Sequence, residues 1–200
     1  MIAIVSVFID RAVLDRYLLP SIPADITERH FIEGTRPSNM AALYNRVLLE
    51  TAARVVIFSH PDVEFPPETC HALADCLQGD VAVAGLVGVV SQPKYEYIFS
   101  DKIDKPQDVD SLDSCLLVVN RDLGIRFDAS TFDELHLYGE DYCYAARAMG
   151  FKCLVLPAAR FNHASVTFKQ HGDQWGHYTM YRSRLLQKWS DRFRERIVTT

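Results

Sequence analysis

The apolar positions of the first 60 residues fall into short blocks separated by polar segments. Unbroken apolar runs rich in β-branched residues predict buried strands, and apolar positions three or four residues apart predict helices that cover a sheet. Pro20 ends the first helix, and the side chain of Asn39 caps the second. In order, the pattern predicts a strand at 2–9, a helix near 12–19, a strand at 30–33, a helix after Asn39 and a strand at 55–58.

This alternation is typical of α/β domains, in which a mostly parallel sheet lies between two layers of helices. Ligands of such sheets bind at the carboxyl ends of the strands. The later blocks continue the pattern, with Gly85 and Gly88 permitting close approach of neighbouring chain. They predict a helix from 66 to about 78, a strand at 81–90, a long functional or mobile loop at 91–111, a strand at 116–119, a helix at 141–149 and a strand at 153–156.

The last predicted helix, about 176–197, is amphipathic and basic. Its polar surface carries six basic residues, and its apolar residues repeat every three or four positions. The helix therefore packs on the preceding domain, lies on an anionic membrane surface or contacts a partner. We expect a domain at 1–165 and a C-terminal tail with this helix at 166–200. The apolar residues are Tyr178, Tyr181, Leu185, Trp189, Phe193 and Ile197.

Composition narrows the class of protein. With 48% hydrophobic and 24% charged residues, the 200-residue chain is typical of one globular domain. A net charge of -5 argues against a nucleic-acid partner. The five cysteines form no CxxC pair, so we expect reduced, mostly buried thiols. The sequence starts directly with the first strand, and no apolar run approaches the roughly 18 residues of a membrane span. We expect a cytoplasmic protein, peripheral to the membrane if its last helix binds one.

Polar side chains follow the third predicted strand. His60-Pro61-Asp62 comes directly after the apolar run at 55–58, where a carboxylate is placed to hold a divalent cation against a diphosphate. A turn made of His, Pro and Asp with only a structural role is the alternative.

Two adjacent acids mark the start of a later helix. At that position the positive end of the helix dipole favours ionised Glu140 and Asp141, and an ionised carboxylate can remove a proton from an attacking hydroxyl. Capping of the helix is the alternative explanation. His163, after the strand at 153–156, is positioned to complete a metal site or to serve a structural role.

These segments together resemble the family 2 glycosyltransferases. The resemblance covers about residues 1–165 and is strongest to the short StrF-type glycosyltransferase-like domains. It rests on Ile4-Val5-Ser6-Val7, His60-Pro61-Asp62-Val63, Leu135-His136-Leu137-Tyr138, Tyr138-Gly139-Glu140-Asp141-Tyr142-Cys143, Arg147, Gly150-Phe151, Pro157 and His163.

The resemblance implies a GT-A fold, a nucleotide-diphosphate sugar donor, Mg²⁺ or Mn²⁺, and transfer to an acceptor hydroxyl with inversion. Asp62 matches the last acid of the DxD motif and His163 the histidine on the metal side. Asp141 matches the base of the Glu-Asp motif, next to Glu140. His60 stands where the first DxD acid is usual and brings no negative charge. The residues implied in substrate binding are Ser6, Asp10, His60, Asp113 and His136.

Two other functions remain open on the sequence. A domain of the same fold that binds a nucleotide sugar or carbohydrate without catalysis fits the His60 replacement. A nucleotide-binding or nucleotidyl-transferring α/β domain would use the same strand ends, although the sequence contains neither GxxxxGK[ST] nor GxGxxG.

Overall fold

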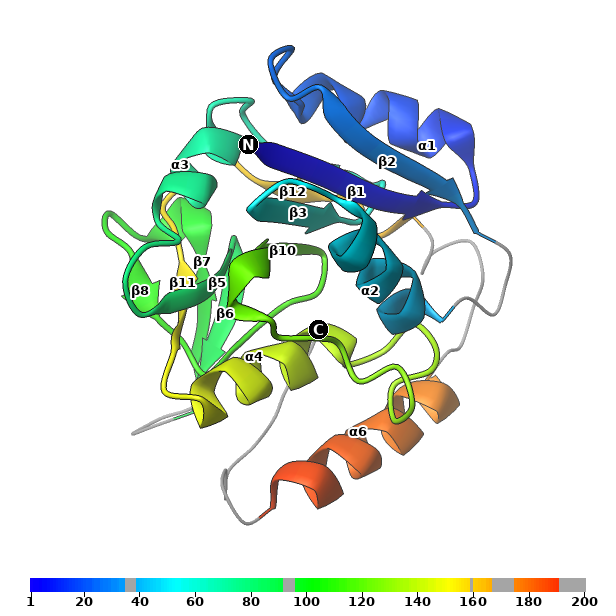
Figure 1. The fold of residues 1–200 in the computed structure, drawn as a ribbon, viewed down its shortest axis with the longest axis vertical. Coiled ribbons are helices and arrows are strands. Elements are labelled where there is room, and N and C mark those ends of the chain that lie inside the picture. The colour runs from blue at the N-terminus through cyan, green and yellow to red at the C-terminus, as the bar shows by residue number, and fades with distance from the viewer. Residues whose placement is uncertain (35–38, 92–95, 159, 167–174, 191–200) are drawn as a thin grey trace.

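The computed structural model of the protein describes residues 1–34, 39–91, 96–158, 160–166 and 175–190. In these ranges the chain forms three layers, with a central sheet between helices (Figure 1). The predicted three-layer α/β/α architecture is therefore confirmed.

The central sheet has seven strands in the order β2-β1-β3-β10-β5-β11-β8. Five of them run in the same direction, because β1 pairs in parallel with β2 and β3, β5 pairs in parallel with β11, and β10 lies antiparallel between β3 and β5. The short β8 is antiparallel to β11. The strands are β1 (Ile2–Phe8), β2 (Glu28–Glu33), β3 (Val55–Ser59), β5 (Val81–Gly85), β8 (Gln107–Asp108), β10 (Leu116–Asn120) and β11 (Lys152–Val155).

Alternate residues of each strand face opposite layers of helices. One face packs against α1 (Arg11–Arg16) and α3 (Thr69–Asp75), and the other against α2 (Met40–Glu50) and α4 (Tyr138–Ala148). Three 3-10 turns lie at Leu19–Ser21, Ser100–Lys102 and Arg121–Leu123.

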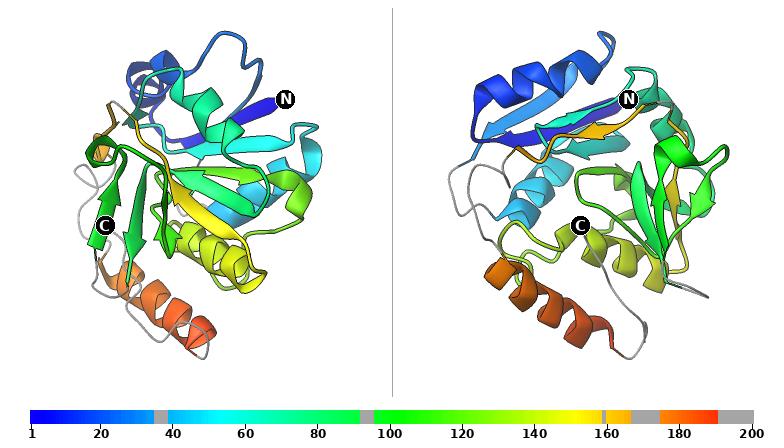
Figure 2. Two further views of the ribbon diagram at one scale, coloured as in Figure 1. Left: turned by 90° about the vertical axis from the view of Figure 1, so that its left-hand side faces the viewer. Right: turned by 180° about the vertical axis from the view of Figure 1, so that it is seen from behind.

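The last described helix, α6 (Trp175–Trp189), packs outside α4, as both views of Figure 2 show. Its residues Tyr181 and Leu185 are fully buried in the same core as α2 and α4. The predicted apolar stripe therefore packs on the domain over this length, while Phe193 and Ile197 lie outside the described residues. Among the helices described, none combines the length and apolarity that a bilayer crossing requires.

Two small sheets complete the fold. The first has the order β7-β6-β9, and the second pairs β12 with β4 in antiparallel register. Their strands are β6 (Val87–Val90), β7 (Glu96–Phe99), β9 (Ser111–Leu112), β4 (Val63–Glu64) and β12 (Asn162–His163).

Several predicted boundaries differ from the structure. The single strand expected at 81–90 is two strands in different sheets, and the expected loop at 91–111 contains β7 and β8. The break follows Gly85, where a Cβ atom would lie 2.8 Å from the carbonyl oxygen of Leu116. The chain therefore approaches β10 more closely than a side chain allows. Helix α4 also begins three residues earlier than expected, at Tyr138.

Candidate metal centre and acidic pair

The two parts of the candidate metal centre meet because two short strands pair. His60 and Asp62 follow β3, and the backbone N–H of His60 donates to the carbonyl of Cys115 at 2.8 Å. The next residue, Val63, lies opposite His163 in the β4–β12 pair. This register places the imidazole of His163 beside the carboxylate of Asp62, although the two residues are far apart in the sequence.

His60, Asp62 and His163 offer three metal-binding atoms within 4.8 Å of one another. His163 Nε2 lies 3.4 Å from Asp62 Oδ1. Two ligands about 2.1 Å from a tetrahedral ion lie about 3.4 Å apart, so this pair already has the spacing of neighbouring ligands. The donor set of two imidazoles and one carboxylate fits a divalent cation.

The environment sets the charge of each of these groups. Burial alone would raise the pKa of Asp62, but the hydrogen bond to His163, nearby imidazoles and the backbone N–H of Val166 lower it to about 2. Burial and the neighbouring His163 lower the pKa of His60. Burial also opposes protonation of His163, yet the bond to Asp62 raises its pKa. Before any cation binds, these shifts favour a proton on His163 beside an ionised Asp62 and disfavour a proton on His60.

Asp113 lies near this cluster, and Glu140 lies near Asp113. Asp113 lies between β9 and β10, where its carboxylate accepts from the backbone N–H of Cys115 at 2.7 Å, and its charge acts on both His60 and His163. Glu140 is 2% exposed, and its Oε2 has no hydrogen-bond partner among the described residues. Burial, then the charge of Asp113, raises the pKa of Glu140 well above its usual range. This direction is opposite to the ionisation expected from the helix start.

Asp141 is turned toward α6 and is 1% exposed. Its Oδ1 accepts from Trp189 Nε1 at 2.8 Å and lies 2.7 Å from Lys188 Nζ. Lys188 also binds Asp128 at 2.8 Å. Burial raises the pKa of Asp141, although Lys188 opposes that rise. The helix start was expected to favour ionisation of Asp141, and burial outweighs that effect here too. The Asp141 side chain contacts α6. The metal-binding atoms come instead from the turn between β3 and β4 and from β12.

Close packing fixes the first turn of α4. A Cβ atom on Gly139 would lie 2.8 Å from Ser114 Cβ and 2.9 Å from Leu117 Cδ1. The preceding Leu137 has a φ of 64°, in the left-handed region that costs a branched residue energy, and its side chain is buried.

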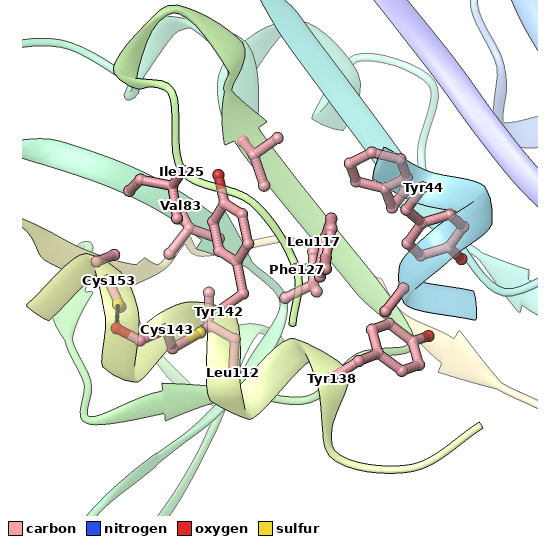
Figure 3. Close-up of a cluster of buried hydrophobic side chains, with 14 of the residues drawn as sticks. Tyr44, Val83, Leu112, Leu117, Ile125, Phe127, Tyr138, Tyr142, Cys143 and Cys153 are labelled. Carbon is pink, nitrogen blue, oxygen red and sulfur yellow. Dashed lines mark hydrogen bonds between the residues drawn. The ribbon is translucent and has the colours of Figure 1, made fainter. Parts of the chain in front are cut away.

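Tyr138 connects this turn to the metal cluster and to α2. Its hydroxyl lies 3.3 Å from His60 Nε2. Its ring is edge-on to that of Tyr44, with 5.6 Å between the ring centroids. Figure 3 shows both rings in the same buried cluster. Tyr138 and Glu140 share the first turn of α4, so the packing of Tyr138 against His60 and Tyr44 also positions Glu140 relative to His60.

The other predicted substrate residues are more dispersed. Ser6 is fully buried in β1, and its hydroxyl has no hydrogen-bond partner among the described residues. Asp10 is exposed and caps α1 by accepting from Ala12 N at 2.9 Å. His136 packs against the ring of Tyr181 and has a pKa lowered by burial, then by His177. The structure therefore brings His60, Asp62, His163, Asp113 and Glu140 into one region and leaves Asp10 at a helix cap.

The sequence did not reveal Tyr138, Lys188 and Trp189 as contacts of the site. Periodicity assigned Trp189 to the buried stripe of its helix and Lys188 to the surface. It gave no sign that both side chains bind Asp141, which lies 48 residues earlier than Trp189.

No protein-family model matches the sequence, and no curated protein is significantly similar to it. Solved structures do match. The mannosyltransferase PcManGT from Pyrobaculum calidifontis, in complex with GDP-Man and Mn²⁺, has a TM-score of 0.62 and 12% identity, with 99% of this chain and 65% of that chain covered. GalNAc-T7 with UDP, GalNAc and Mn²⁺ has a TM-score of 0.63 and 10% identity, with 82% and 43% covered.

A third neighbour is S. aureus TarS in complex with UDP-GlcNAc, with a TM-score of 0.55 and 13% identity over 92% of this chain and 66% of that chain. This chain has a GT-A-type fold. It spans less than two thirds of the mannosyltransferase and less than half of GalNAc-T7. At these identities the likeness establishes the fold alone.

Proposed function

We propose that the protein is a metal-dependent glycosyltransferase that moves a sugar from a nucleotide-diphosphate donor to an acceptor hydroxyl, with inversion at the anomeric carbon. The observation that carries this proposal is the cluster of His60, Asp62 and His163 at the carboxyl end of β3 in a GT-A-type fold. Neighbours of this fold were solved with Mn²⁺ and nucleotides or nucleotide sugars.

In this proposal Asp62 and His163, with His60 as the third donor, hold Mg²⁺ or Mn²⁺. The cation supplies positive charge that stabilises the departing diphosphate. Asp113 and His136 contact the sugar, while Ser6 and Asp10 lie toward the nucleoside from the carboxyl end of β1. Asp113 is supported by its position beside both the metal cluster and Glu140.

The acidic pair supplies the base that takes the acceptor proton. The family resemblance assigns this role to Asp141, and the packing of the structure gives a second candidate in Glu140. Among the residues described, none bonds to the buried Oε2 of Glu140 near Asp113, whereas Asp141 binds Lys188 and Trp189. A buried carboxyl with a raised pKa is suited to proton transfer near neutral pH.

The test is transfer from a panel of GDP-, UDP- and dTDP-sugars with Mn²⁺, comparing wild type with Asp141→Asn and Glu140→Gln. Loss of turnover in one variant, with donor binding kept, identifies the base. Near-normal transfer by Asp141→Asn contradicts its assignment, and near-normal transfer by both variants contradicts the role of the pair.

The alternative is a non-catalytic domain that binds a nucleotide sugar or carbohydrate. Two observations favour it: His60 replaces a carboxylate expected at the metal, and the Asp141 carboxylate is engaged by α6. Metal-dependent binding of a nucleotide sugar by calorimetry, without hydrolysis or transfer to any acceptor, would support this alternative over the transferase.

A further inference from the structure

The donor atoms around the candidate metal centre differ in kind from those that Mg²⁺ prefers. Mg²⁺ takes oxygen ligands and keeps several waters, whereas imidazole nitrogen suits first-row transition metals. His60 and His163 supply two of the three clustered donors, and Asp62 alone supplies oxygen. We infer that His60 makes this centre selective for transition metals, with Zn²⁺ and Co²⁺ bound more tightly than Mn²⁺, and Mg²⁺ bound most weakly.

The inference requires that His60 stay in place when a cation binds. Its backbone N–H bonds to Cys115, and its ring lies 3.3 Å from the Tyr138 hydroxyl. The centroid of the ring is 5.5 Å from that of His163, which approaches it edge-on. A ring held on these sides cannot readily withdraw to leave room for the waters of a hydrated Mg²⁺.

The other two donors are also fixed by the backbone. Asp62 is 3% exposed, and its Oδ2 accepts from the backbone N–H of Val166 at 2.8 Å. Its carbonyl accepts from the N–H of Ala164 at 3.0 Å. His163 is held by the β4–β12 pair. The donor set is therefore built into the fold.

The small negative charge of the donor set also disfavours Mg²⁺. A centre with two carboxylates would offset the cost of stripping water from Mg²⁺ more fully than a centre with one. Asp113 contributes negative charge nearby, but it lies outside the group of donors within 4.8 Å. The replacement of a carboxylate by the neutral imidazole of His60 therefore disfavours Mg²⁺ more than a metal that gains a bond to nitrogen.

The experiment is calorimetric titration of EDTA-treated, dialysed protein with Zn²⁺, Co²⁺, Mn²⁺ and Mg²⁺, with the Co²⁺ absorption spectrum as a second readout. We expect wild type to bind Mg²⁺ at least about tenfold more weakly than Mn²⁺. His60→Asp should narrow that ratio by about tenfold or more, and His60→Asn should weaken Co²⁺ and Zn²⁺ and shift the Co²⁺ spectrum. His163→Ala should weaken binding of every transition metal.

His71→Asp, on the surface of α3, is the matched control, because it makes the same replacement outside the cluster. It should leave the metal order unchanged. Circular dichroism without metal confirms folding of each variant. His60→Asn, which adds no charge, keeps the test decisive if His60→Asp unfolds.

Wild type that binds Mg²⁺ as tightly as Mn²⁺, binds none of the four metals, or keeps its Co²⁺ spectrum in His60→Asn would overturn the inference. The inference rests on the proposed function for its choice of cation site, but different results would refute the metal selectivity and the transferase activity. Efficient transfer with Mg²⁺ and equal affinity for Mg²⁺ and Mn²⁺ would refute the selectivity alone. The expected metal order without turnover of any nucleotide sugar would refute the transferase alone.

Discussion

The indole nitrogen of Trp189 donates a 2.8 Å hydrogen bond to the carboxylate of Asp141. This contact joins the acidic pair of α4 to the last described helix, and Lys188 adds an ion pair to the same oxygen. Tyr181 and Arg184 bind Asp133 from the same helix. Helix α6 is thus docked by polar contacts as well as by its apolar stripe.

The Lys188→Met substitution tests this docking. Among the described side chains it leaves the buried carboxylate of Asp141 with the indole donor of Trp189, and it removes the ion pair of Asp128, which keeps its hydrogen bonds from Ser130 and Thr131. Because Lys188 is partly exposed, we expect a loss of about 1–3 kcal/mol in the free energy of unfolding, measured by urea denaturation at pH 7. Lys188→Arg should restore part of it. Arg182→Met is the control, since Arg182 has no ion pair within the described ranges, and an equal loss there would contradict the expectation.

The same contacts bear on the predicted membrane or partner surface. Arg184 and Lys188 already bind carboxylates of this chain. Arg192, Arg194 and Arg196 lie outside the described residues. Contact of this helix with a membrane or a partner stays a prediction.

Glu140 predicts a particular dependence of stability on pH. Its pKa is raised in the folded protein, so the unfolded chain loses its proton first as the pH increases. The contribution of Glu140 to stability is full below its unfolded pKa of about 4.5 and declines as pH rises to its folded pKa, by at most about 1.4 kcal/mol per pH unit. Glu140→Gln, which cannot ionise, should remove this decline. Urea denaturation from pH 4 to 8 measures it, and parallel curves for wild type and variant would refute the assignment.

The close contact at Gly139 predicts a cost for even one methyl group. The Gly139→Ala substitution would place a Cβ atom 2.8 Å from Ser114 Cβ, which is closer than two non-bonded carbon atoms can approach. We expect a loss of about 1–3 kcal/mol in unfolding free energy, because neither β10 nor the helix turn can shift freely. Ser114→Gly should recover part of it in the double variant. A Gly139→Ala protein as stable as wild type would show that the turn has room to move.

The cysteines predict slow reaction with thiol reagents. All five are free, and four of them are buried. Burial raises the pKa of Cys70 and of Cys76 to about 12, and that of Cys115 and Cys143 well above the usual range. The native protein should therefore react slowly with Ellman's reagent at pH 8 and release five equivalents after unfolding. Rapid reaction of several native thiols would contradict this packing.

Local signals made much of the fold predictable. The side chain of Asn39 caps α2 by accepting from Ala42 N at 2.8 Å, as its position before an apolar periodic segment indicated. The direction of β10 could not be inferred, because a run buried on both faces is equally apolar in either direction. The break after Gly85 also depends on Leu116, which only the fold brings near.

Some features of the candidate site were also predictable from local sequence, and others depend on the folded structure. The sequence offered His60 and Asp62 as candidates because they directly follow a buried strand, and it offered His163 because of its place after the strand at 153–156 and the family resemblance; their part in a metal site stays a prediction. The engagement of Asp141 depends on α6, and the pKa of Glu140 depends on burial beside Asp113. Neither follows from a position at the start of a helix, since burial outweighs the dipole at both acids.

The β4–β12 pair has a consequence for the order in which the protein acquires its metal centre. His60 and Asp62 are made before β5, whereas their partner His163 follows β11 in the chain. A nascent chain that ends before His163 lacks one imidazole and the backbone contacts at 164 and 166. The complete three-donor centre can therefore assemble only after every strand from β1 to β11 has been made.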